Sequence, residues 1–266
     1  MDPQNTPTTN RSPLVTIPGA IIVAGAIIAI AIVWTTKPAK APEVQNSGAQ
    51  IPQVGQVTLA PITASDHIFG NPNAPIKIVE FSDPSCPYCK QFNSTMEQVM
   101  GAYGPGGQVA WVYRQFPLDK PDPNGNILHP NSGNEAEALE CAASLGGNTA
   151  FWAYEKEWYN VFPLQGATDR SVADDTAQLA QIAKDVGLNA IAFNDCLTSN
   201  QFKSKIDAQY TDGINAGVMG TPFNIVITPS GTKIPLTGAN SGAVSYATLK
   251  SIIDTLISAE TETAGQ

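Results

Sequence analysis

Two cysteines separated by two residues, in the run Cys86-Pro87-Tyr88-Cys89, stand between an apolar segment and an amphipathic one. Residues 76–81 have the apolar, β-branched character of a buried strand. Apolar side chains then recur at helical spacing, at Phe92, Met96, Val99 and Tyr103. A sulfur at the start of such a helix lies near unpaired N–H groups and the positive end of the helix dipole, which favour its thiolate. The pattern therefore predicts a strand, a turn and a helix that begins at a thiol–disulfide redox site.

The same cysteine pair could instead serve a metal. Zinc sites need four ligands, and the chain has no second pair of this spacing and only two histidines, His67 and His129. Copper binding by the pair, with Met96 as a soft neighbour, is a second alternative. Because Met96 and Met100 lie at helical spacing, packing in a core explains both methionines better. Copper binding is kept as an alternative, and no cofactor is predicted.

The composition restricts the class of protein. With 266 residues and 42% hydrophobic content, the chain is long enough to bury one full core. Its 14 basic and 23 acidic residues give a formal net charge of −9. Phosphate backbones are bound by clustered lysine and arginine, and the sequence has no such cluster. A nucleic-acid partner is therefore not expected.

A membrane anchor is predicted near the amino terminus. Residues 14–34 carry no charge and are rich in Ile, Ala and Val, and at the rise of a helix they span about 30 Å of hydrocarbon. A cleaved signal peptide is the alternative, because Ala39-Lys40-Ala41 resembles a cleavage site. The apolar run is longer than a usual signal peptide has, and only Arg11 precedes it, so a retained signal-anchor helix is favoured.

The cysteines indicate on which side of the membrane the domain lies. All four follow the apolar run, and an even number suits a compartment in which thiols are paired. Residues 1–13 are accordingly predicted as a short cytoplasmic tail, and the domain as extracytoplasmic. The expected location is the cell membrane, crossed once.

Residues 35–65 are predicted as a flexible linker, because they contain four prolines among Gln, Ser and Gly and show no hydrophobic period. The domain follows at residues 66–260, before a tail at 261–266. Strands are expected at 76–81, 109–116, 223–228 and 233–237. Helices are expected at 86–103, 132–145, 149–162, 172–186, 190–197, 201–217 and 245–259, with a capping box of Ser132 and Glu135. This order is that of an α/β thioredoxin fold with a helical insertion at about 128–200.

Three longer motifs add to the cysteine pair. They are DHIFGNPNAPIKIVEFSDPSCPYC, HPNSGNEAEALECAASLGGNTAFWAYEKEWY and GVMGTPFNIVI, in that order. With them, the sequence closely resembles the DsbA-like thiol–disulfide oxidoreductases, in particular their membrane-tethered bacterial members, over about residues 66–256. The resemblance implies an enzyme that introduces disulfides into cysteine-containing exported proteins. It also implies a quinone-linked membrane partner that reoxidises the enzyme.

The resemblance assigns roles to individual residues. Cys86 matches the exposed sulfur that attacks and leaves, and Cys89 matches its buried partner. Thr221 and Pro222 match a cis-proline loop facing the dithiol, where the backbone of Thr221 pairs with an extended substrate segment. Glu80 matches a buried acid that exchanges protons with the second cysteine.

Glu80 shares the predicted strand face of Ile76 and Ile78. Burial there is expected to raise its pKa into a range useful for proton transfer. An ordinary acid at a strand end is the alternative, since strand boundaries are uncertain by a few residues.

Cys141 and Cys196 both fall in the helical block, 55 residues apart. A structural disulfide is expected, because oxidation is the default outside the cytosol. Two buried free thiols, or a relay role in the exchange reaction, are the alternatives.

One departure from the family concerns the residues between the first two cysteines. The strongest oxidants of the family have Pro-His there, whereas Tyr88 cannot become cationic. Asp83 is expected to oppose a thiolate on Cys86, and Lys90 to support it. The alternatives to an oxidase are therefore an isomerase or reductase of the same fold and, from another class, a copper-binding or metallochaperone protein.

Overall fold

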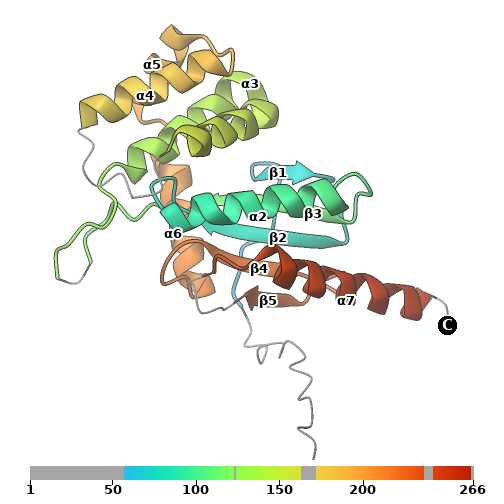
Figure 1. Cartoon of the computed structure of the whole chain (residues 1–266). Helices are drawn as coiled ribbons and strands as arrows, with labels where there is room; N and C mark the ends of the chain where they lie inside the picture. The colour runs from blue at the N-terminus through green and yellow to red at the C-terminus, as the bar shows by residue number, and fades with distance from the viewer. Residues whose placement is uncertain (1–56, 123, 163–171, 237–241, 265–266) are drawn as a thin grey trace, which may run out of the picture. The chain divides into compact units, whose positions relative to one another are not determined.

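A sheet of five strands organises the described part of the chain (Figure 1). The computed structural model describes residues 57–122, 124–162, 172–236 and 242–264. The strands are β1 (His67–Gly70), β2 (Ile76–Ser82), β3 (Val109–Gln115), β4 (Phe223–Ile227) and β5 (Lys233–Leu236). They are ordered β1-β3-β2-β4-β5, with β2 and β3 parallel and the other neighbours antiparallel. A parallel pair needs a crossover connection, which α2 (Pro87–Tyr103) supplies.

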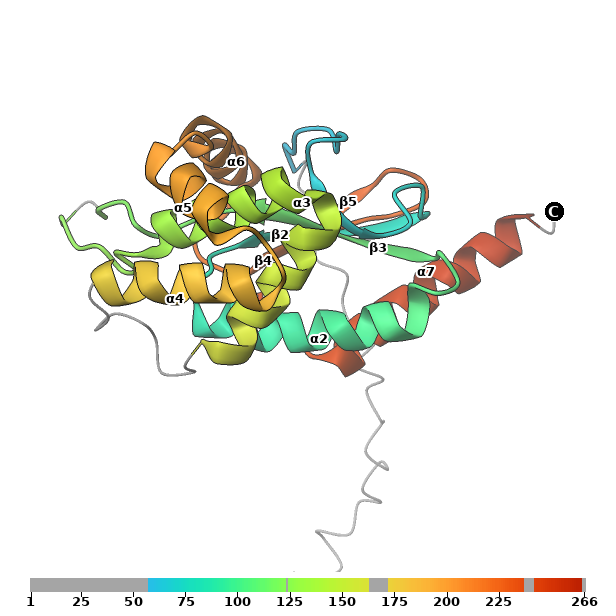
Figure 2. The same ribbon diagram turned by 90° about the horizontal axis from the view of Figure 1, so that it is seen from above.

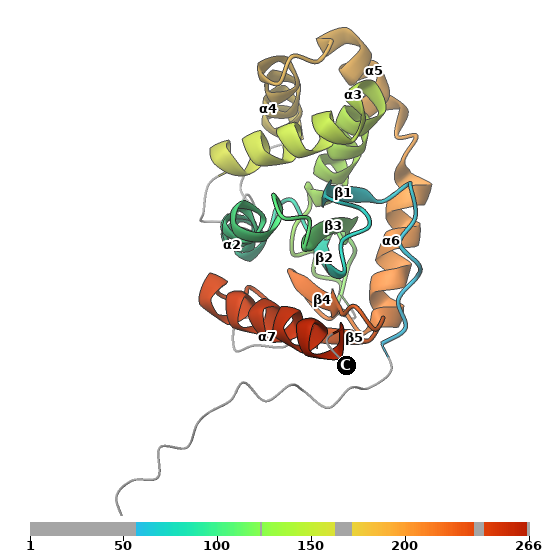
Figure 3. The same ribbon diagram turned by 90° about the vertical axis from the view of Figure 1, so that its right-hand side faces the viewer.

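The helices cover both faces of the sheet and one of its edges. Figure 2 shows α2 and α7 (Tyr246–Ala264) side by side, and Figure 3 places them on the face opposite α6 (Lys203–Ala216). The block of α3 (Ser132–Val161), α4 (Val172–Asp185) and α5 (Ala190–Ser199) lies beyond the β1 edge (Figures 1 and 3). The predicted thioredoxin fold with a helical insertion is thereby confirmed.

Alternation along β2 divides the core between the two faces. Ile76 and Ile78 pack with apolar residues of α2 and α7 in one buried cluster. Val79 and Phe81 belong to a second cluster, with apolar residues of α6. Successive side chains of a strand point to opposite faces, so Glu80 lies on the α2 face among apolar neighbours.

Two elements differ from the sequence-based expectation. β1 is a short strand that pairs with β3, and four residues are too few for a hydrophobic period to reveal. The helices expected at 132–145 and 149–162 form one element, α3, which is interrupted at Gly147. The φ angle of 71° at this residue lies in the left-handed region that glycine tolerates.

The predicted capping box at the start of α3 is wrong. Asn131 is the N-cap residue, and the Ser132 hydroxyl donates to the carbonyl oxygen of His129 at 3.0 Å. Glu135 accepts instead from the hydroxyl of Ser85, in the turn that precedes α2. The Glu135 side chain is therefore engaged in a tertiary hydrogen bond and does not cap the start of the helix, as a capping box requires.

Of the predictions for the amino-terminal region, the structure tests only those for residues 57–65. The predicted tail (1–13) and anchor (14–34) lie outside the described residues, among which no helix is long and apolar enough to cross a membrane. Residues 57–65, expected in the linker, pack against the domain instead. Leu59 is buried, and the Arg114 guanidinium donates to the carbonyl oxygens of Ala60 and Pro61, each at 3.2 Å. Residues 57–65 therefore belong to the domain and not to the predicted linker, whose remaining residues lie outside the described part of the chain.

A disulfide joins Cys141 in α3 to Cys196 in α5, as expected. Replacing both cysteines with alanine is expected to lower the free energy of unfolding by about 4 kcal/mol, because the bond closes a long loop in the unfolded chain. Urea unfolding without reductant, followed by circular dichroism, measures the loss. An unchanged midpoint would contradict the assigned structural role.

Candidate active site

The turn between β2 and α2 places the first cysteine at the start of the helix. Asp83 Oδ1 accepts a hydrogen bond from the Ser85 N–H at 2.7 Å, and the Asp83 carbonyl accepts one from the Cys86 N–H at 3.0 Å. Cys86 is the N-cap of α2, and its carbonyl accepts from the N–H groups of Cys89 and Lys90 at 3.1 and 3.2 Å. Its side chain makes no capping bond. The backbone thus begins the helix while the sulfur stays available for chemistry.

Both thiols of the pair are free, and the loop before β4 covers the first one. The Cys86 thiol donates to the carbonyl oxygen of Thr221 at 3.3 Å. The peptide bond between Thr221 and Pro222 is cis, as the resemblance implies. Cys86 is 3% exposed, and Cys89 is fully buried. The expected exposure of Cys86 is therefore wrong, because the Thr221 loop packs over its sulfur.

The two thiols differ strongly in acidity. A hydrogen bond from the Cys89 thiol lowers the pKa of Cys86 to about 7, against the effects of burial and of the Asp83 carboxylate. Burial, followed by its interactions with Cys86, raises the pKa of Cys89 well above the ordinary value. Near neutral pH the thiolate therefore forms on Cys86 while Cys89 keeps its proton. Lys90, expected to support that thiolate, donates to the carbonyl oxygen of Phe162.

Glu80 is buried close to the thiols, with 1% of its surface exposed. Burial raises the pKa of Glu80 to about 8, although hydrogen bonds from Ser82 and Trp111 lower it. The indole N–H of Trp111 donates to Glu80 Oε2 at 2.9 Å. The Glu80 charge also helps to raise the pKa of Cys89, so the two groups interact electrostatically. Proton transfer between them stays a prediction.

Two further titratable groups near the pair escape the sequence reasoning. Glu155 of α3 is buried, accepts a hydrogen bond from Asn93, and has a pKa raised well above its ordinary value by burial and by Glu80. His129, in the loop before α3, pairs through Nδ1 with Asp83 Oδ2 at 2.7 Å. The sequence offers only weak signals for these two residues. Glu155 is an acid on a helix rich in aromatic residues, and His129 is one of only two histidines.

Cys86 lies on the wall of a cavity of about 690 Å³, together with Thr221 and His129. Large apolar side chains line the same cavity and are exposed to solvent, namely Tyr88, Ile127, Leu128 and Met219. Met219, directly before the cis-proline loop, is 97% exposed. Single apolar side chains on a surface are ordinary, but several gathered around one reactive sulfur are typical of a protein-binding site.

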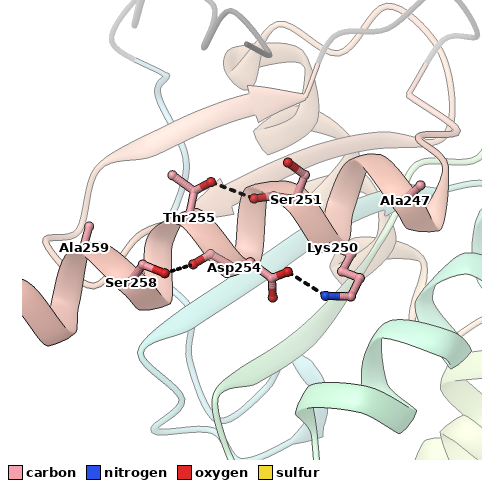
Figure 4. Close-up of a pocket in the computed structure, with 7 residues that line it drawn as sticks. All are labelled: Ala247, Lys250, Ser251, Asp254, Thr255, Ser258 and Ala259. Atoms are coloured by element: carbon pink, nitrogen blue, oxygen red, sulfur yellow. Dashed lines mark hydrogen bonds and ion pairs between the residues drawn. The ribbon is translucent and has the colours of Figure 1, made fainter. Parts of the chain in front are cut away.

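A second hollow runs along α7 (Figure 4). Polar side chains along it bond within the helix: Lys250 pairs with Asp254 at 2.6 Å, and Thr255 donates to the carbonyl of Ser251 at 2.8 Å. The hollow is lined by no thiol or imidazole. The cavity beside Cys86 is therefore the candidate active site.

The described geometry does not support zinc or copper binding by the cysteine pair. The part of the chain that the structure describes has no group of three or more His, Cys, Asp or Glu side chains able to hold a metal ion. Met96, the suggested soft neighbour for copper, is fully buried in the core cluster. Its packing role is confirmed.

Comparison with known sequences agrees with this geometry. The family model described as thioredoxin matches residues 63–255. The chain is 33% identical over 107 residues to the Na(+)/H(+) antiporter NhaA 1 of Mycolicibacterium gilvum, a match that covers 40% of this chain and 15% of the antiporter. It is 33% identical over 90 residues to a Rickettsia bellii protein provisionally named a protein-disulfide oxidoreductase, covering 33% of this chain and 34% of that protein. The chain thus spans only a small part of the first of these curated relatives.

Among solved structures, the chain is similar to Wolbachia pipientis alpha-DsbA1, with a TM-score of 0.60 and 20% identity. The superposition covers 76% of this chain and 96% of that one. At this identity the likeness concerns the fold, which agrees with the family match from β1 into α7. The chain therefore belongs to the thioredoxin family, and its fold is that of the DsbA-like thiol–disulfide oxidoreductases.

Proposed function

We propose that this chain is an extracytoplasmic thiol:disulfide oxidoreductase that introduces disulfides into exported proteins through Cys86 and Cys89. The observation that carries the proposal is the position of the Cys86 thiol at the start of α2, hydrogen-bonded to the Thr221 carbonyl of the cis-proline loop, with Cys89 fully buried. The difference in acidity between the two thiols agrees with it. The more acidic thiol lies on the wall of a cavity with an apolar lining. The provisional name of the Rickettsia relative supports the same chemistry.

The reaction starts from the oxidised pair. A client thiolate attacks the Cys86 sulfur, the bond to Cys89 breaks, and its electron pair leaves on Cys89, which takes up a proton. The client is then joined to Cys86 by a mixed disulfide. A second client thiolate attacks the client sulfur in that bond, and Cys86 leaves as a thiolate. The client has lost two electrons to the pair and gained a disulfide.

The acidity of Cys86 favours the oxidising direction. A thiol of low pKa leaves faster, and stabilising its thiolate stabilises the reduced enzyme. The oxidised pair is then a stronger oxidant. A pKa of about 7 for Cys86 supports this direction even though Tyr88 stands where a histidine would add charge. An isomerase or reductase of the same fold is the alternative.

The client is expected to bind in the cavity beside Cys86. An unfolded polypeptide offers apolar side chains to the exposed residues there and backbone groups to Thr221. The hydrogen bond from the Cys86 thiol to the Thr221 carbonyl belongs to the reduced pair. The oxidised pair has no S–H, so that carbonyl can then accept from the backbone of a docked client.

Location and reoxidation are part of the same proposal. The uncharged run at residues 14–34 supports a membrane anchor, and the disulfide between Cys141 and Cys196 supports an oxidising compartment. A quinone-linked membrane protein is the proposed reoxidising partner, by family resemblance. Protease digestion of intact cells and of lysed cells tests the location, because only an extracytoplasmic domain is cut before lysis.

The decisive experiment measures the direction of exchange. The oxidised full chain is mixed with a reduced, unfolded client that forms one native disulfide, and client thiols are counted by alkylation and mass spectrometry. We expect catalysed oxidation and a reduction potential for the pair nearer about −120 mV than about −270 mV. A potential near the lower value, with no acceleration of client oxidation, would contradict the oxidase and favour the reductase.

A further inference from the structure

A buried ion pair lies beside the reactive thiol. The Asp83 carboxylate is fully buried and accepts hydrogen bonds from the N–H groups of Ser85 and Leu118 at 2.7 and 2.8 Å. Its third partner is His129 Nδ1, at 2.7 Å. The backbone N–H of His129 donates to the carbonyl of Leu118 at 3.0 Å, which fixes the loop. The imidazole is thus held in one place with Nδ1 toward the carboxylate.

The pair is electrically linked to Cys86. His129 and Cys86 line the same cavity, and Asp83 precedes Cys86 by three residues in the turn. The Asp83 charge raises the pKa of Cys86. Burial opposes a charge on His129, but Asp83 and Cys86 outweigh it, and the pKa of His129 is raised. A protonated His129 therefore cancels the charge that opposes the thiolate.

We propose that His129, held by Asp83, is a positioning residue that places a positive charge beside Cys86 and so stabilises its thiolate. Tyr88 leaves the Cys-x-x-Cys motif without a cation of its own. A residue 43 positions after Cys86 in sequence supplies one through the fold. The inference deepens the proposed function, and its test observes the thiolate directly, so it can fail while exchange activity persists.

The surroundings of His129 contain other charged or titratable groups. Besides Asp83 and Cys86, the loop after β3 contributes Asp119, Lys120 and Asp122, and α6 contributes Tyr210. Glu135 of α3 accepts a hydrogen bond from Ser85, which itself bonds to Asp83. The acids oppose a thiolate. Lys120 pairs with Asp207 at 3.1 Å, and its ammonium lies 3.7 Å from the centre of the Tyr210 ring. Of these groups, His129 is the one whose side chain bonds to the Asp83 carboxylate, which precedes Cys86.

Replacing His129 with asparagine tests the proposal. Asparagine keeps an N–H donor in the place of Nδ1 and removes only the charge. The thiolate of the reduced full chain is titrated by its ultraviolet absorbance, with Cys86→Ser as the blank. We expect the midpoint to rise by about one pH unit, a roughly tenfold smaller thiolate-to-thiol ratio at a given acidic pH. His129→Lys is expected to restore the low midpoint.

Lys120→Gln is the matched control, because it removes a cation that lines the same cavity but is engaged with Asp207. Its midpoint is expected to match that of the unmodified chain. An unchanged midpoint in His129→Asn, or an equal shift in Lys120→Gln, overturns the proposal.

A second measurement needs no variant. Linkage is reciprocal, so a thiolate that gains from His129⁺ must raise the pKa of His129 in turn. Because the chain has only two histidines, proton NMR can follow His129 with His67 as the internal reference. The pKa of His129 is expected to be about one unit higher in the reduced than in the oxidised protein. Equal values in the two states overturn the proposal even if the variant fails to fold.

Discussion

Replacing Cys86 with serine is expected to abolish client oxidation, a loss of roughly a thousandfold or more, the scale seen when an enzyme loses its nucleophile. A hydroxyl neither forms nor leaves a disulfide under these conditions. Replacing Cys89 with serine and supplying the client in its disulfide form is expected to give a different result. The Cys86 thiolate attacks the client disulfide, one client sulfur leaves as a thiolate, and no Cys89 thiol is present to resolve the mixed disulfide. Mixed disulfides then accumulate and are visible on non-reducing gels as adducts of one enzyme and one client.

The other two cysteines provide the control for this experiment. The variant with Cys141 and Cys196 both replaced by alanine keeps the reactive pair, so it is expected to oxidise the client under conditions where it is folded. Peptide mapping of the trapped adduct is expected to place the client on Cys86 alone. A client joined to Cys141 or Cys196, or full activity of the Cys86→Ser variant, would contradict the assignment of Cys86 as the reactive sulfur.

Replacing Glu80 with glutamine is expected to remove a large pH dependence of stability. The pKa of Glu80 is about 8 in the folded protein against an ordinary 4.5, so the folded state holds a proton that the unfolded chain releases between these values. The resulting stabilisation is fully present below about pH 4.5 and is lost as the pH rises through about 8. It amounts to on the order of 5 kcal/mol. Glutamine is neutral throughout, so the variant lacks this term.

Urea unfolding at about pH 5 and about pH 9 measures the effect. The stability of the unmodified chain is expected to fall across this interval more steeply than that of the glutamine variant. Glu97→Gln is the matched control, because Glu97 is exposed and its ion pair with Lys156 lies on the surface. Parallel pH profiles for the unmodified chain and Glu80→Gln would contradict the raised pKa.

The parts of the site that follow from neighbouring residues are predictable from sequence. The cysteine pair, the strand before it and the helix after it are one continuous segment, and strand alternation places Glu80 on the buried face with Ile76 and Ile78. The order of the larger elements likewise follows from hydrophobic period and from glycine and proline positions.

The contacts that modify the reactive sulfur do not follow from local patterns. The bond from Cys86 to Thr221 joins residues 135 positions apart, and that from His129 to Asp83 spans 46 positions. Periodicity carries no information about such pairs. The wrong capping-box prediction has the same cause. The local motif predicts a bond within the first turn of α3, but Glu135 accepts a hydrogen bond from Ser85, 50 residues earlier in the sequence.

The carbonyl oxygen of Thr221 holds the Cys86 thiol in the resting structure. Oxidation of the pair removes the S–H donor, and every extended polypeptide carries backbone N–H groups that can take its place. The same carbonyl is therefore occupied by the thiol in one redox state and open to a peptide backbone in the other. The oxidised protein is accordingly expected to hold an extended chain more tightly than the reduced protein does.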